Sequence, residues 1–129
     1  MEAEQPNVAQ FKELVKNPND GPVVMLNLLK FKTEGGAASY ARYAEEVDRF
    51  LKDVGGIITY MGKMKELLIG HETWDAVILV QYPSRKAYLR MVNDPDYLEI
   101  HKYREAAIDR SVLYATDEMD GRELFTLGT

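Results

Sequence analysis

Two segments of the chain carry apolar side chains on both faces of what their composition predicts to be β-strands. In residues 23–32, VVMLNLLKFK, both the even-numbered and the odd-numbered positions are mostly apolar. Residues 75–82, DAVILVQY, repeat this pattern and are rich in β-branched residues. Because successive side chains of a strand point to opposite faces of the sheet, both faces of these strands need an apolar cover. The chain must therefore fold so that its sheet is covered on two sides.

A long amphipathic helix is expected between these strands. Its apolar residues recur at steps of three and four from Tyr40 to Val54, and charged residues occupy the opposite side. Ser39 is the predicted N-cap. Gly55 and Gly56 are expected to end the helix, since glycine adopts the left-handed conformation that closes helices.

The remaining segments complete a recognisable order. In chain order they are a helix at 8–16 capped by Asn7, a break at 17–22, a strand at 57–64, an arm of a hairpin from 63 to 69, a helix from 84 to 92, a second helical piece from Asp94-Pro95 to 109, a strand at 111–116 and a short arm at 124–127. After the leading helix the order is β-α-β-β-α-β. This is the ferredoxin-like plan of the α+β class, a four-stranded antiparallel sheet with both main helices on one face.

The two helices can cover only one face of that sheet. A monomer rarely leaves so large an apolar surface in water, and a second copy packed sheet against sheet is the simplest cover. We therefore expect a homodimer that associates through its sheet faces. A pocket is expected between each sheet and its helices or its partner, where concave apolar sites form.

Composition bounds the organisation and the partners of the chain. Its 129 residues are expected to form a single domain, with a leading helix and loop (1–22), a ferredoxin-like core (23–116) and a C-terminal arm (117–129). The net charge of -5 and the absence of a basic stripe argue against nucleic-acid binding. No apolar run is long enough to span a membrane, and the acidic residues 1–10 lack the core of a signal peptide. The chain contains no cysteine, which fits a reducing compartment, and a cytoplasmic location is expected.

An ordered set of motifs resembles a known family. The set comprises Tyr43, Gly55-Gly56, Trp74-Asp75, YPSR at 82–85, and NDPDY ending at Tyr97 and followed by Arg104. Together these motifs resemble the domain-of-unknown-function family 1330 over roughly Val23 to Thr116. The resemblance implies a dimeric α+β barrel and no established reaction. Members often carry an arginine before the glycine of the second strand, where this chain has Met61 before Gly62. The wider superfamily includes cofactor-independent monooxygenases, lactone isomerases, haem-degrading enzymes and ligand-sensing domains.

Several polar residues stand out on this apolar framework. Tyr97, His101 and Arg104 fall at i, i+4 and i+7, on one side of the second helix. They form either a boundary stripe with polar tips in solvent or a base and a cation at the rim of a pocket. Asn27 is an amide within an apolar strand, and it is either a core asparagine with its hydrogen bonds satisfied or a ligand contact. His101, Asn27 and Tyr82 are the candidate catalytic residues.

Tyr97 and Arg104 are candidate ligand-binding residues, together with three residues on other segments. Tyr60 and Tyr114 lie on separate expected strands, and each offers an apolar ring with one hydroxyl. His71, in an expected loop, is either a solvated surface residue or a general base.

Two cofactor classes can be weighed from these positions. Haem-degrading relatives carry an asparagine on the first strand, a tryptophan on the third and a histidine on the second helix. Asn27 and His101 lie in similar places, but Tyr82 stands where the tryptophan would be. HETWD lacks the second histidine of a zinc-binding helix, so we expect no metal site, and no cofactor is required.

The leading hypothesis is a small barrel that binds a small, partly apolar molecule and acts on it as a cofactor-independent oxygenase or isomerase. The alternative is a non-catalytic ligand-binding or assembly module. A haem-binding, monooxygenase-like protein is a further, less favoured alternative.

Overall fold

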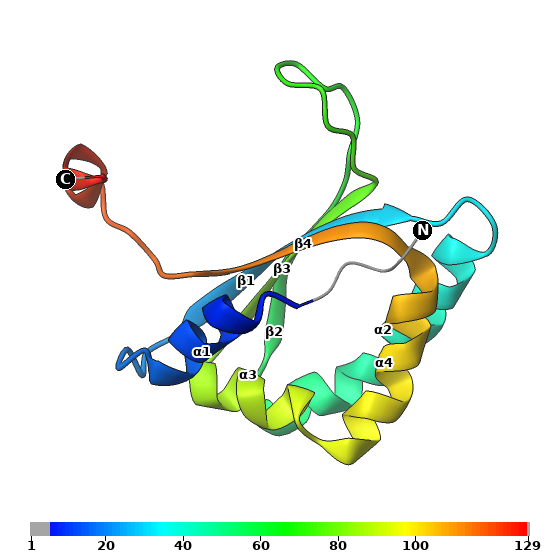
Figure 1. The fold of residues 1–129 in the computed structure, drawn as a ribbon, viewed down its shortest axis with the longest axis horizontal. Helices are drawn as coiled ribbons and strands as arrows, with labels where there is room; N and C mark the ends of the chain where they lie inside the picture. Colours follow the sequence, from blue (N-terminus) through cyan, green and yellow to red (C-terminus); the bar gives the residue numbers. More distant parts are fainter. Residues whose placement is uncertain (1–5, 129) are drawn as a thin grey trace.

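The computed structural model describes residues 6–128, and it has the expected ferredoxin-like order of elements (Figure 1). The elements are α1 (Val8–Lys16), β1 (Val23–Phe31), α2 (Gly36–Val54), β2 (Ile57–Lys63), β3 (Ala76–Tyr82), α3 (Arg85–Val92), α4 (Pro95–Ala107), β4 (Ile108–Thr116) and a short 3-10 helix, η1 (Glu123–Thr126). The first five residues of the acidic N-terminal segment lie outside the described residues.

The four strands form one antiparallel sheet in the order β2-β3-β1-β4. β1, the strand with apolar residues on both faces, lies inside the sheet between β3 and β4. Figure 1 shows α2 and α4 together on one side of the sheet, with α3 beside them. The predicted α+β class and ferredoxin-like topology are confirmed.

Most predicted helix ends are where the capping residues indicated. Asn7 accepts a hydrogen bond from the backbone N–H of Gln10, and Ser84 accepts one from that of Ala87. Asp94 caps α4, with Pro95 as the first helical residue. α2 closes on Gly55, whose φ of 80° requires glycine.

The predicted start of α2 is wrong. The helix begins three residues before Ser39, at Gly36, after Gly35 in the left-handed conformation. The Ser39 hydroxyl instead donates to the backbone oxygen of Tyr103 in α4, 2.8 Å away. The Ser39 side chain, which the sequence pattern predicted to cap α2, therefore forms a contact between α2 and α4 instead.

The boundary between α4 and β4 was also predicted wrongly. α4 ends at Ala107, two residues before the expected position, and β4 starts at Ile108, three residues before the expected Ser111. The Ala107 oxygen accepts a hydrogen bond from the Lys32 N–H, and Ile108 already pairs with Phe31 of β1. Pairing with the centre of the sheet thus overrides the helical pattern at this junction.

The two faces of the sheet differ in burial as the strand pattern predicted. Val23, Met25 and Leu29 of β1 are buried beneath the helices. Strand register places a second apolar set on the opposite face, which we call the open face. Its apolar members are Val24, Leu26, Leu28, Ile57, Tyr60, Val77, Leu79, Val112 and Tyr114. Tyr60 and Tyr114 are mostly exposed, so the open face is uncovered in a single chain.

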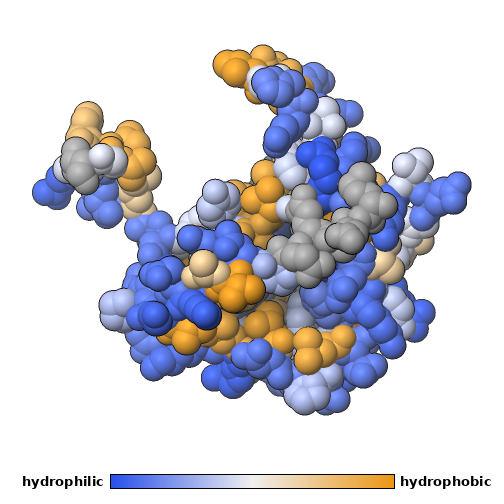
Figure 2. All heavy atoms as spheres, in the orientation of Figure 1, coloured by the Kyte–Doolittle hydropathy of each residue, from blue (hydrophilic) through white to orange (hydrophobic). Residues whose placement is uncertain are grey.

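Two segments extend away from the body of the molecule (Figure 1). The first, residues 64–75, joins β2 to β3 and rises on the side of the sheet opposite α2 and α4; we call it the hairpin arm. The second, residues 117–128, follows β4 and carries η1; we call it the C-terminal arm. Figure 2 shows apolar side chains gathered at both tips, where Leu68, Ile69 and Phe125 are 88%, 93% and 86% exposed. No helix in residues 6–128 is long and apolar enough to cross a membrane.

Gly36 provides a test of the junction between α2, α4 and the end of β1. A Cβ at this position would lie 2.8 Å from the Ala107 oxygen and 3.2 Å from the Phe31 Cβ. We expect Gly36→Ala to lower the free energy of unfolding by about 1–3 kcal/mol, as overpacking does elsewhere. Urea denaturation measures the change. Gly121→Ala, whose Cβ would meet nothing within 4 Å, is the matched control and should change stability little. Equal stability of the two variants would contradict the close packing.

Candidate functional site

An open cavity of about 1500 Å³ lies between the sheet and its helices. The β1 and β3 residues that face the helices form one wall, and residues of α2, α3 and α4 lie across from it. α1 with its flanking residues, β4 and two residues of β2 supply the rest of the lining. The lining is mainly apolar and aromatic, with a few polar groups set among the apolar ones. Such a lining is typical of small-molecule sites.

The wall formed by the sheet contains one amide, Asn27, which contacts one cation, Arg104. Arg104 Nη2 donates to Asn27 Oδ1 at 3.4 Å. The Asn27 amide nitrogen donates to the backbone oxygen of Ile78 on β3 at 3.3 Å. Asn27 is thus both a satisfied sheet residue and the contact that orients the Arg104 guanidinium at the cavity. A guanidinium has five N–H donors, so most of those of Arg104 remain available.

Five tyrosines with largely buried rings lie around Arg104. They are Tyr40, Tyr43, Tyr82, Tyr88 and Tyr97, and all five line the cavity. Burial raises the pKa of each phenol, to about 12 for Tyr88, and the positive charge of Arg104 acts against this rise in every case. All five are therefore neutral hydroxyls at physiological pH.

Two further contacts order the α4 side of the cavity. The Tyr97 hydroxyl lies 2.8 Å from the Tyr43 hydroxyl and links α4 to α2. His101 Nδ1 lies 2.8 Å from Glu105 Oε1, one helical turn along. Because a carboxylate only accepts, this hydrogen bond requires a proton on Nδ1 and leaves Nε2 as the nitrogen able to act as a base.

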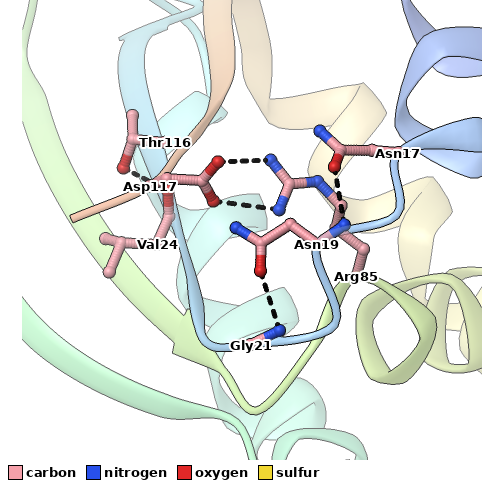
Figure 3. Close-up of polar contacts among 7 residues, drawn as sticks. All are labelled: Asn17, Asn19, Gly21, Val24, Arg85, Thr116 and Asp117. Carbon is pink, nitrogen blue, oxygen red and sulfur yellow. Dashed lines mark hydrogen bonds and ion pairs between the residues drawn. The ribbon is translucent and has the colours of Figure 1, made fainter. Parts of the chain in front are cut away.

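A second arginine at the cavity is already neutralised. Arg85 is 7% exposed, and its two terminal nitrogens donate to the two carboxylate oxygens of Asp117 at 2.9 and 3.1 Å (Figure 3). The Arg85 guanidinium lowers the pKa of Asp117, with a further hydrogen bond from Asn19. Asp117 directly follows β4, so this bidentate pair fixes where the C-terminal arm leaves the sheet.

The structure brings together five of the eight residues predicted from the sequence. Asn27, Tyr82, Tyr97, His101 and Arg104 all line the cavity.

Of the other three predicted residues, two lie away from the cavity and one lies at its edge. Tyr60 is on the open face, and His71 is exposed in the hairpin arm. Tyr114 borders the cavity but belongs to the open face by its pairing with Leu26, and it is 64% exposed.

Sequence reasoning missed part of the tyrosine cluster and the buried ion pair. Tyr40 and Tyr43 lie on the apolar side of the α2 pattern, and neither is among the predicted site residues, although Tyr43 belongs to the family motifs. Their spacing was a usable signal, because two tyrosines on one helical face place two hydroxyls on the same surface. Arg85 and Asp117 are 32 residues apart, and no local pattern joins them. In residues 6–128 no group of three or more histidine or acidic side chains is arranged to hold a metal ion.

The fold and cavity define the class of protein as a ferredoxin-like α+β protein with a cavity between its sheet and its helices. The chain belongs to the domain-of-unknown-function family DUF1330, which matches residues 30–117. Among curated proteins, no match to this chain is found.

Solved structures agree with this assignment. A protein of unknown function from Rhodopseudomonas palustris is 30% identical, with a TM-score of 0.83, over 93% of this chain and 99% of that one. A dimeric ferredoxin-like protein of unknown function from Jannaschia is 14% identical, with a TM-score of 0.63, over 76% and 100%. A Caulobacter crescentus protein, named as a candidate antibiotic biosynthesis monooxygenase, is 14% identical with a TM-score of 0.60 over 78% and 92%. The last two likenesses show the fold alone.

The Arg85–Asp117 pair predicts a pH-dependent contribution to stability. The pKa of Asp117 is lower in the folded chain than in the unfolded chain, where an aspartate has a pKa of about 3.9. The pair therefore stabilises the fold above about pH 4, and the contribution is lost as pH falls through the lowered pKa. At pH 7 we expect Asp117→Asn to lower the free energy of unfolding by about 1 kcal/mol, a small value because Asp117 is 42% exposed and screened by solvent.

Urea denaturation at pH 7 and near pH 3 measures this contribution. The difference between wild type and Asp117→Asn should shrink at the lower pH. Asp53→Asn, at an exposed position of α2, is the matched control. A difference that persists unchanged at low pH would show that the charge of Asp117 is not its source.

Proposed function

We propose that the protein binds a small, partly apolar molecule in the cavity between its sheet and its helices. The observation that carries this proposal is one part of the lining, where the hydroxyls of neutral tyrosines, the Asn27 amide and the Arg104 cation lie among apolar side chains. Side chains that only fill a core do not need polar groups, yet several of the residues that line this cavity carry one. The family match names no reaction, so the proposal stands on these residues.

His101 is the residue that would turn binding into catalysis. It lies at the cavity with Nδ1 held by Glu105, and its Nε2 would accept a proton from a bound ligand. Proton removal of this kind is the step shared by cofactor-independent oxygenases and isomerases. Tyr82 and Asn27 would then contact the ligand as hydrogen-bonding groups rather than as bases, since a phenol of raised pKa and an amide are neutral.

A neutral apolar dye, N-phenylnaphthylamine, tests the cavity as a binding site. We expect its fluorescence to rise on binding, with saturation at one dye per chain. Ala44 lines the cavity on α2, and Ala44→Phe should weaken binding about tenfold or more by filling the space. Ala41→Phe adds the same ring on α2 outside the cavity lining and is the matched control. Equal effects of the two variants, or no saturable binding by wild type, would overturn the proposal.

We also propose that two copies of the chain associate through their open faces. The open face is apolar along all four strands, and the hairpin arm rises beside it with its apolar tip in solvent. A second sheet laid on this face would cover both features at once. A stable interface needs about 800 Å² from each partner, which a four-stranded sheet with two arms can supply. The Jannaschia structure of the same fold is described as dimeric.

Light scattering at micromolar concentration tests this association. Wild type should have twice the mass of one chain. Leu79 lies on the open face, paired with Leu26 and Tyr60, and Leu79→Asp should give monomers because it places a charge in the interface. Ala37→Asp, at an exposed position of α2, is the control and should remain dimeric. A monomeric wild type, or a Leu79→Asp variant that stays dimeric and folded, would refute association through this face.

A further inference from the structure

Arg104 carries a positive charge that nothing in its described surroundings neutralises. Its one side-chain partner is the neutral amide of Asn27, and no carboxylate in residues 6–128 lies within ion-pair distance of it. The half-buried side chain points its guanidinium into a cavity lined by tyrosine rings. A cation in such surroundings loses part of its hydration and lacks the partner that would compensate for it.

The charged groups of α3 and α4 at the cavity, apart from Arg104, are paired, whereas Glu13 and Lys16 line the cavity from α1 without an ion pair in residues 6–128. Arg85 is bound by both oxygens of Asp117. Glu105, next to Arg104 in the chain, directs its carboxylate to His101. The tyrosines do not supply a counter-charge either, because burial keeps their phenols neutral. Arg104 therefore has unused donors and an unused charge, and the hydroxyls around it can donate further hydrogen bonds.

We propose that the ligand of this cavity is an apolar molecule with one singly charged oxyanion, such as a carboxylate or an enolate, and that Arg104 binds this group. The proposal rests on the binding function proposed above and specifies its ligand class. A guanidinium matches the planar geometry of a carboxylate through two parallel hydrogen bonds. Asn27 accepts a hydrogen bond from Arg104 on the sheet side of the cavity. The Arg104 guanidinium is therefore oriented before a ligand binds.

The groups around Arg104 also favour a ligand with one negative charge at this point. A phosphate monoester carries nearly two charges, and proteins usually meet it with several cations or with backbone amides at the start of a helix. Among the buried tyrosines there is a single unpaired cation, Arg104, while Lys16 of α1 lines the cavity together with the acidic Glu13. One monoanionic end and an apolar body match that arrangement.

Two dyes that differ in one anionic group test the proposal. Anilinonaphthalene sulfonate carries a single sulfonate on the same ring system as the neutral N-phenylnaphthylamine. For wild type we expect the anionic dye to bind more tightly. Arg104→Gln should weaken binding of the anionic dye about tenfold or more, the contribution typical of a charge-assisted hydrogen bond. The same substitution should change the affinity of the neutral dye by less than about twofold. Arg104→Lys should retain part of the preference for the anion.

Controls separate this proposal from the binding function on which it rests. Arg90→Gln removes an equal charge from the exposed surface of α3 and should leave both affinities unchanged. Ala44→Phe should weaken both dyes, which shows that both occupy the cavity. If Arg104→Gln weakens both dyes equally, or neither, the anionic ligand class is wrong while the cavity remains a binding site. If Ala44→Phe changes the affinity for neither dye, the dyes do not bind in the cavity, and the proposed binding function is wrong. Circular dichroism and urea denaturation of each variant exclude loss of the fold as the cause.

Discussion

The architecture depends on a central strand that is apolar on both faces. β1 lies between β3 and β4, and its odd-numbered side chains are buried beneath the helices while its even-numbered ones face the open side. Asn27 belongs to the odd-numbered row, so its amide is carried to the helix side at the middle of the sheet. From there it meets Arg104 of α4, 77 residues away in the chain. The alternation of side chains along β1 thus produces both the contact between Asn27 and Arg104 at the cavity and the apolar open face.

The family motifs are mainly structural in this fold. Asp75 of the Trp-Asp motif accepts the Phe31 N–H at 2.8 Å and pairs with Lys30, at the point where the register between β1 and β4 shifts. It therefore satisfies a backbone donor that the irregular pairing would leave without a strand partner. In the Gly-Gly motif, Gly55 supplies the left-handed turn, and a Cβ on Gly56 would approach the Tyr82 ring within 3.3 Å. Such motifs identify a fold without specifying a reaction.

The sequence predicted the elements well and the site in part, and the difference has physical causes. Helical periodicity placed Tyr97, His101 and Arg104 on one side of α4 because the spacing of a helix is regular. The sequence placed Tyr60 on a strand but not on a face of the sheet. A register shift between Ile58 and Tyr60 puts Ile58 on the helix side with Val80, while Tyr60 lies on the open face beside Leu79. An irregularity of one residue reverses the face of a side chain, and single-sequence patterns do not show it.

The contacts that define the site connect segments that are distant in sequence. Tyr43 meets Tyr97 across 54 residues, and Arg104 meets Asn27 across 77. Only the topology brings these pairs together, so the sequence indicated the residue types and not their partners.

The arrangement of these partners separates two chemical zones within one cavity. Arg104 of α4 donates to Asn27 on the helix side of the sheet, where its remaining N–H groups are the available hydrogen-bond donors. His101 belongs to a pair that is more solvated, since its side chain is 32% exposed and that of Glu105 is 62% exposed. The hydrogen bond to Glu105 occupies Nδ1, and Nε2 is the ring nitrogen left to accept a hydrogen bond from a ligand. Tyr82 is a neutral phenol, because burial raises its pKa, and it offers a hydroxyl rather than a base. His101 and Arg104 both belong to α4, but the histidine lies at its more solvated part, and the arginine is held by the Asn27 amide of the sheet.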